Sequence, residues 1–315
     1  MSRFLSMAAT MQTLSLAAME EASREGRREA DIEHLLMALT LNEQIAGQVL
    51  RRKGVTLEAV RTAVAAQHAQ QLSSLGVTTD AEQPGRIVFH ETSGYAWNDR
   101  ALRVLNLAGD GGASDVLRGL VIEPSGMIAE ILEQLGTSAD AVTAELDALE
   151  HLPRHARAGR TPRTSFETFI PASIADVWAL VSDAERMPDW EPMIDSVSPR
   201  DDDGWDARAR TVRDDGRPIS VKPPFLARRI ERLEALEPTR VTWRFTFPDA
   251  PGSNAQSLTL DLAPAAGGTQ LTLTSSWTTR AGWRGMIGRM LRPLQRLLNW
   301  MRLLQTGSAI SRVFR

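Results

Sequence analysis

Hydrophobic residues recur at helical spacing through the first half of the chain. In the stretch DIEHLLMAL, residues 31–39, apolar side chains follow an acidic start with the period of an α-helix. Asp31 occupies an expected N-cap, and Gly54 and Gly136 lie where helices are expected to end. We therefore expect residues 1–150 to form an all-α domain of several short helices.

This helical pattern occurs twice. The segment that begins at Glu33 aligns with the segment that begins at Ser114. The matched apolar positions are Leu36 with Leu117, Leu39 with Leu120, Val49-Leu50 with Ile131-Leu132, and Ala59-Val60 with Ala141-Val142. Such self-similarity indicates two copies of one helical unit, and we expect residues 68–94 to connect them.

From Arg163 the pattern changes to alternation with a period of two, which is typical of strands. One face carries Val241, Trp243, Phe245 and Phe247 in one strand, Leu258, Leu260 and Leu262 in the next, and Leu271, Leu273, Ser275 and Trp277 in the third. The intervening positions are polar, so we expect an antiparallel sheet with one wet face, on which Arg244 and Asp261 lie. Residues 264–268, PAAGG, would form the turn between the last two strands.

A long amphipathic segment, residues 282–305, follows the strands. Its apolar stripe runs from Trp283 to Leu304, and Pro293 is expected to kink or divide the helix. Because the sheet must cover its apolar face, we expect this stripe to pack on it. We therefore expect residues 163–315 to form a second domain, after an Arg- and Pro-rich linker at residues 151–162.

Composition excludes several classes of protein. The chain has no cysteine, which excludes disulfides and thiolate zinc sites. Its two lysines, Lys53 and Lys222, do not follow glycine, which excludes a P-loop ATPase. The start of the chain lacks the pattern of a signal peptide, and no segment approaches the ~18 apolar residues of a spanning helix. We expect a cytoplasmic protein.

Charge differs between the halves. Residues 1–161 contain 15 basic and 21 acidic residues, whereas residues 162–315 contain 21 and 18. No acidic residue follows Asp261, but eight arginines do. The arginines of the linker lack interleaved aromatic residues, so we expect no nucleic-acid binding. The basic final helix would suit peripheral contact with an anionic membrane, but the sheet needs the same apolar stripe.

Catalytic side chains are scarce in the second half. After residue 155 there is no His, Cys or Tyr, which argues against a His-dependent hydrolase or cyclase. The five histidines show no ligand pair near a carboxylate, so we expect no metal and no cofactor. Arg232 and Glu234 alternate with Ile230, and an inward pair would fix a polar head group. The alternative is that both lie on the solvated face.

Residues 5–150, with both repeats, resemble the amino-terminal domain of Clp protein unfoldases, a pseudo-twofold helical bundle that docks proteins. In relatives that bind arginine-phosphorylated proteins, a Glu of the TEHLL motif contacts the modified arginine, and Glu33 matches that position. Ile32 replaces the usual Thr, and Ser114 stands where the second repeat would carry the Glu. The alternative for Glu33 is a first-turn acid favoured by the helix dipole.

Residues 164–306 resemble the START-like (SRPBCC) superfamily, which includes polyketide cyclase/dehydrase and lipid-transport domains. The matching features are Val177-Trp178, Ser182-Asp183, Trp190, Pro192, the stretch EALEPTRVTWRF and the terminal helix. The resemblance implies an apolar ligand cavity between a curved sheet and the last helix. The expected cavity residues are Trp190, Ile230, Arg232, Glu234, Trp243, Phe245, Leu260, Leu273, Trp277, Leu294, Leu298 and Met301. A packed aromatic core is the alternative.

These patterns predict an all-α repeat domain plus an α+β helix-grip (START-like) domain with an antiparallel sheet and a long C-terminal helix. We expect a non-catalytic binding or adaptor protein that holds a small lipid-like or polyketide-like ligand. Its first domain would dock a protein or peptide, such as partners of the Clp system, with Glu33 in the docking site. A cyclase/dehydrase that uses Glu234 or Arg232, and a lipid transfer protein, are the alternatives.

Overall fold

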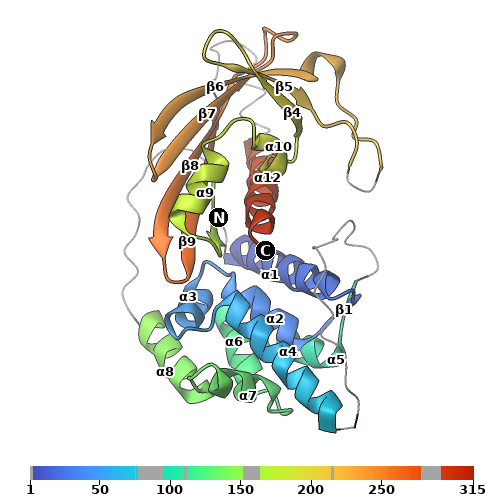
Figure 1. Cartoon of the computed structure of the whole chain (residues 1–315), viewed down its shortest axis with the longest axis vertical. Helices are drawn as coiled ribbons and strands as arrows, with labels where there is room; N and C mark the ends of the chain where they lie inside the picture. Colours follow the sequence, from blue (N-terminus) through green and yellow to red (C-terminus); the bar gives the residue numbers. More distant parts are fainter. Residues whose placement is uncertain are drawn as a thin grey trace. The chain divides into compact units, whose positions relative to one another are not determined.

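Helices fill the first half of the chain and strands dominate the second, as the change of pattern at Arg163 predicts (Figure 1). The computed structural model describes residues 3–74, 76, 95–109, 112–151, 164–213, 216–277 and 292–315. The chain divides into two compact units, Met1–Ala156 and Arg157–Arg315. The predicted linker lies outside the described residues except for His151.

The first unit is the predicted helical repeat. Its helices are α1 (Arg3–Arg24), α2 (Ile32–Thr40), α3 (Ile45–Arg52), α4 (Leu57–Ser74), α5 (Asp99–Ala108), α6 (Ala113–Val121), α7 (Met127–Gln134) and α8 (Ala139–Glu150). The matched positions Leu36 and Leu39 of α2, and Leu117 and Leu120 of α6, are all fully buried. A short parallel pair, β1 (Glu29–Ala30) with β2 (Ala96–Trp97), joins the two repeats.

Local signals at the helix ends are confirmed. The Asp31 side chain caps α2, and His34 Nδ1 accepts a hydrogen bond from the Asp31 N–H at 3.0 Å. Gly54 and Gly136 follow α3 and α7 with φ of 79° and 77°, a backbone conformation that favours glycine. The expected connection from residue 68 is wrong at its start, because α4 continues to Ser74.

The second unit is built on a seven-stranded antiparallel sheet in the order β3-β9-β8-β7-β6-β5-β4. The strands are β3 (Thr164–Ile170), β4 (Ile194–Pro199), β5 (Trp205–Ala209), β6 (Ala227–Leu236), β7 (Arg240–Thr246), β8 (Gln256–Ala265) and β9 (Gly268–Trp277). The predicted β8–β9 turn is confirmed, and Gly267 supplies its positive φ of 76°. Strand β4 has no clear alternation and was not expected.

The described part of this unit also contains the helices α9 (Ile174–Val181), α10 (Met187–Trp190) and α12 (Arg292–Val313), with the short 3-10 helix η1 (Pro223–Phe225) before β6. The apolar face of the sheet and these helices share one hydrophobic core. Pro293 lies in the first turn of α12, where a missing N–H is tolerated. The residues expected to extend the helix before Arg292 lie outside the described part.

The C-terminal end of α12 differs from expectation. The amphipathic helix was expected over residues 282–305, but it continues to Val313 and buries Ala309 and Ile310. Gly307 allows α12 to approach the sheet, since a Cβ at this position would lie 2.9 Å from Phe166 Cε1. The end of the chain is therefore part of the sheet's cover.

Candidate functional site

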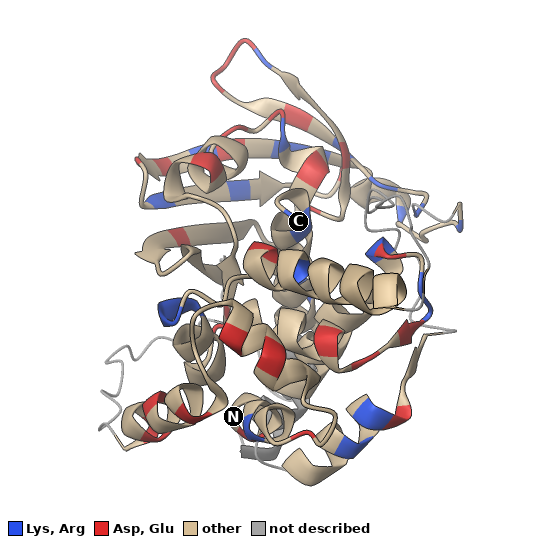
Figure 2. Cartoon of the chain, turned by 60° about the horizontal axis from the view of Figure 1, so that its bottom comes forward, with Lys and Arg blue, Asp and Glu red and all other residues tan. Residues whose placement is uncertain are grey.

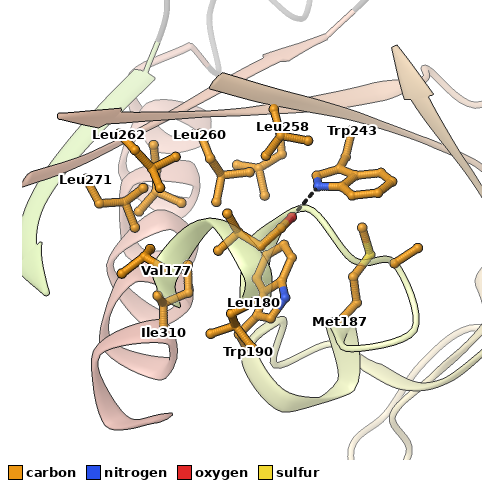
Figure 3. Packing of buried hydrophobic residues seen from close by; sticks show 14 of the residues in the cluster. Val177, Leu180, Met187, Trp190, Trp243, Leu258, Leu260, Leu262, Leu271 and Ile310 are labelled. Carbon is orange, nitrogen blue, oxygen red and sulfur yellow. Dashed lines mark hydrogen bonds between the residues drawn. The ribbon is translucent and has the colours of Figure 1, made fainter. Parts of the chain in front are cut away.

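Five of the residues predicted to line a cavity lie at alternate positions of four adjacent strands. Ile230 of β6, Trp243 and Phe245 of β7, Leu260 of β8 and Leu273 of β9 are at most 1 % exposed. Their alternation places them on one face, toward the helices, and Figure 3 shows Trp243 and Leu260 pointing into the core.

Trp190, at the end of α10, enters the same interior and is 1 % exposed (Figure 3). The Trp243 indole is held by its Nε1–H, which donates to the Val181 carbonyl oxygen at 3.0 Å. The indole N–H of Trp190 is buried without a partner in the described residues. Three of the predicted aromatic residues, Trp190, Trp243 and Phe245, therefore meet in one hydrophobic core.

The structure separates Arg232 from Glu234, which an inward head-group pair would have brought together. The register between β6 and β7 shifts between Arg232 and Glu234, so Glu234 no longer shares the face of Ile230 and is exposed. Arg232 is also exposed, with its Nη1 donating to the Ser182 carbonyl oxygen at 3.2 Å. Its guanidinium lies 5.9 Å from the Trp243 ring, so it borders the core without entering it.

The residues of the final helix that were predicted to line the cavity are not buried where the structure describes them. Leu298 and Met301 are 56 % and 40 % exposed, so they do not belong to the buried interior. The stripe was predicted from the period alone, whereas among the described side chains of α12 it is Leu303 and Ile310 that join the core. The side chains of Trp277 and Leu294 lie outside the described part of the structure.

A buried polar cluster, which sequence analysis missed, lies against α12. The Glu191 carboxylate is fully buried and accepts a hydrogen bond from Thr306 Oγ1 at 3.2 Å. Arg302 Nη2 lies 3.4 Å from Glu191 Oε1, and its Nη1 donates to Gln256 Oε1. Arg302 is not part of the predicted apolar stripe, yet it reaches the buried Glu191 carboxylate and the Gln256 amide.

Arg228 is the second missed residue. It lies two positions before Ile230, on the inward face of β6, and is 8 % exposed. Burial lowers the pKa of Arg228, Arg302 lowers it further by like charge, and Glu191 opposes both. The Arg228 Nε–H has no hydrogen-bond partner in the described residues. The period that placed Ile230 inside was the signal that could have identified it.

An aromatic pair lies beside Arg228. The Arg228 guanidinium carbon is 5.9 Å from the Phe247 ring centre, and Phe225 packs edge-on against Phe247 at 5.1 Å. Both rings are half-buried. This end of the interior therefore combines a cation with apolar surface.

The first unit contains a polar pocket of about 260 Å³ where the two repeats meet. Its lining residues are Arg27, Asp31, Glu33, Gln67, His68, Gln71, Arg100, Ser125, Met127 and Glu130. The predicted docking residue Glu33 is part of this wall. The wall comes from the start of α2, from α4 and α5, and from the start of α7 with the residues before it, so both repeats contribute.

The pocket has unpartnered acceptors. Glu33 is 2 % exposed, and its Oε1 lies 3.5 Å from Arg27 Nη1, while Oε2 has no partner in the described residues. Gln67 Nε2 donates to Glu130 Oε2 at 2.6 Å, which leaves Gln67 Oε1 unpartnered in the same set. Arg100 pairs with Asp31 and its pKa is raised by that hydrogen bond.

Charged residues are distributed over both units (Figure 2). Among the described residues, no group of three or more His, Asp or Glu side chains is placed to hold a metal ion. In that same part of the chain, no helix combines the length and the apolar character needed to span a bilayer.

Part of each half of the chain matches a known family. Residues 161–299 match the family described as polyketide cyclase/dehydrase and lipid transport. Residues 7–88 match the Clp repeat (R) N-terminal domain, which covers the first repeat and part of the connection. No curated protein matches the chain.

Several solved structures are similar. Protein CV1439 from Chromobacterium violaceum is 14 % identical with a TM-score of 0.35, over 48 % of this chain and 96 % of that one. A conserved protein from Geobacillus kaustophilus is 18 % identical with a TM-score of 0.34, over 49 % and 96 % of the two chains. The protein TTHA0849 from Thermus thermophilus is 19 % identical with a TM-score of 0.33, over 48 % and 97 %. No functional conclusion rests on these likenesses.

Proposed function

Since the chain joins a Clp N-terminal repeat region to a domain of the polyketide cyclase/dehydrase and lipid-transport family, we propose that it is a non-catalytic binding adaptor. Its second unit takes up a small apolar ligand, and its first unit docks a protein or peptide. The observation that carries this proposal is the aromatic interior of the second unit. Residues after 155 contain no His, Cys or Tyr that would supply acid–base or nucleophilic chemistry there.

The interior suits an apolar ligand because its wall is made of Trp243, Phe245 and aliphatic side chains, with polar groups at one end. Ligand sites are commonly apolar with a few polar groups that set orientation. The competing interpretation is that these rings only fill a core. An overpacking variant separates the two interpretations, because a packed core resists added volume and a cavity accepts it.

The test replaces Leu260 by Phe in the full chain. If a cavity adjoins Leu260, Leu260→Phe keeps its stability and weakens binding of the neutral fluorescent probe N-phenyl-1-naphthylamine, which the native chain binds saturably. If the interior is only core, the variant loses about 1–3 kcal/mol and the native chain binds no probe. Thr259→Val, on the opposite face of β8, is the matched control: it should not alter probe binding, and it should cost at most about 1 kcal/mol through the lost hydrogen bond with Thr242 Oγ1.

The docking half of the proposal rests on the polar pocket. Its unpartnered acceptors, Glu33 Oε2 and Gln67 Oε1, call for a ligand with N–H donors. Arg27 and Arg100 on the same wall suit an anionic group beside those donors. A phosphorylated arginine side chain offers both, in agreement with the resemblance that singled out Glu33.

Calorimetric titration of the full chain with phosphoarginine, and with arginine as comparison, tests this half. We expect Glu33→Gln to weaken phosphoarginine binding by about tenfold, because a charged acceptor of the guanidinium is lost. Glu58→Gln on α4, whose side chain is 80 % exposed, should bind like the native chain. No binding of phosphoarginine to the native chain would contradict the docking proposal and leave the ligand proposal unaffected.

A further inference from the structure

Charge in the interior of the second unit is unbalanced. The Glu191 carboxylate is shared by Arg302 and Thr306, and Arg302 is also bonded to Gln256. Arg228, buried nearby, makes no ion pair with any described residue. Among the described residues, one buried carboxylate therefore lies near two guanidinium groups, the buried Arg228 and the part-exposed Arg302, and Arg228 has no counter-charge of its own. Burying such a charge is costly unless it is paired.

The end of the chain does not supply the missing anion. No Asp or Glu follows Asp261, so neither α12 nor the residues between β9 and α12 contain a carboxylate. The buried hydrogen-bonding groups that lack a partner also call for an acceptor. In the described part of this unit the buried side-chain atoms without a partner are all N–H groups, on Trp190, Arg228 and Arg229. In the part of the unit that the structure describes, the unpartnered buried groups on the inner side of the sheet are therefore donors, and the carboxylate beside Arg228 is already shared.

A carboxylate fits these requirements. The guanidinium group is a planar donor that binds carboxylates through two parallel hydrogen bonds. The half-buried rings of Phe225 and Phe247 lie beside Arg228. A ligand whose carboxylate binds Arg228 would therefore place its adjoining apolar atoms against these rings. The fully buried wall of Trp243 and Phe245 belongs to the same inner face of the sheet.

We propose that Arg228 binds the carboxylate of an amphipathic organic acid whose apolar body lies toward the aromatic interior. Arg302 and Glu191 form a neutral pair that holds α12 beside this site. This inference rests on the proposed ligand-binding function and specifies its ligand class as a monocarboxylic acid with an apolar chain or ring system.

Two probes with the same apolar body separate the head group from the rest of the ligand. Pyrenebutyrate carries a carboxylate and pyrenebutanol a hydroxyl in its place. We expect the full chain to bind pyrenebutyrate at least about tenfold more tightly, as a charge-assisted hydrogen-bonded pair implies. Because the contact is buried, this preference should persist in 1 M salt, whereas an attraction to surface arginines would be screened.

The decisive variant is Arg228→Gln. We expect it to lose the preference for pyrenebutyrate while its affinity for pyrenebutanol stays within about twofold, which also shows that the interior is intact. Arg244→Gln is the control, since Arg244 lies on the outer face of β7, with its side chain 42 % exposed. That variant should keep the preference.

The outcomes distinguish this inference from the function on which it rests. Equal binding of both probes to the native chain, or a preference retained in Arg228→Gln, would overturn the role of Arg228 and leave apolar ligand binding in place. Failure of the native chain to bind either probe would overturn the ligand-binding function and this inference with it.

Discussion

At the scale of single residues, the interior of the second unit is distinguished by Arg228, a cation held for a ligand at the expense of stability. Removing an unpaired buried charge relieves the cost of its desolvation. We therefore expect Arg228→Met to leave the free chain as stable as the native one, or more stable by about 1 kcal/mol. Denaturant unfolding followed by tryptophan fluorescence measures this unit selectively, because only Trp97 of the eight tryptophans precedes Arg157. A loss of more than about 2 kcal/mol would instead assign Arg228 a structural role.

Glu191 should behave in the opposite way. It is the fully buried acid paired with Arg302, and Glu191→Gln would remove the carboxylate that faces both the buried Arg228 and the part-exposed Arg302. Breaking such a pair from one side costs about 3 kcal/mol or more. The same unfolding measurement should show this loss, and Glu231→Gln on the outer face, whose carboxylate lies 3.6 Å from Arg244, should lose less than about 1 kcal/mol. Equal losses in both variants would contradict the assignment of Glu191 to a buried pair.

At the scale of elements, the close seating of α12 on the sheet depends on Gly307. Replacing a helical glycine by alanine usually stabilises a helix by about 1 kcal/mol. Here the added Cβ would lie 2.9 Å from Phe166 Cε1 and 3.1 Å from Leu273 Cδ1, so the helix or these side chains must shift. We expect Gly307→Ala to destabilise the second unit by about 1–2 kcal/mol, while Gln305→Ala on the exposed side of α12 changes little. A stabilised Gly307→Ala variant would show that α12 is not held this closely.

The sequence predicted most elements because their periods are clear. The β7, β8 and β9 strands alternate cleanly, so Trp243, Leu260 and Leu273 were correctly placed on the inner face. The residues of β6 were assigned to the correct face only as far as the bulge, because the register shift there moves Glu234 to the other face.

The polar part of the site was harder to predict. Charged residues are normally assigned to the wet face, so Arg228 was passed over although it lies in phase with Ile230. In the polar cluster, Arg302 and Thr306 lie 111 and 115 positions after Glu191, a separation that no local pattern reveals. The pocket around Glu33 was predicted only through family resemblance, and its other walls come from α4, α5 and the second repeat.

At the scale of the whole molecule, the chain combines two units whose unpartnered polar groups are of opposite kinds. The helical unit presents unpartnered acceptors in a polar pocket, and the described part of the sheet unit presents unpartnered donors at the end of an apolar interior. The unpartnered acceptors predict a donor-rich basic group as the ligand of the first unit. The unpartnered donors predict an organic anion as the ligand of the second. These complementary deficits support a protein that brings two different ligands onto one chain.

The measurement that tests the central claim most directly is native mass spectrometry of the full chain, after incubation with a solvent extract of its source cells. We expect a one-to-one adduct, and denaturing analysis should release a carboxylic acid with an apolar body. Arg228→Gln should lose most of this adduct, whereas Arg244→Gln should retain it. A bare mass for the native chain, with and without the extract, would contradict the account and identify the aromatic interior as a core.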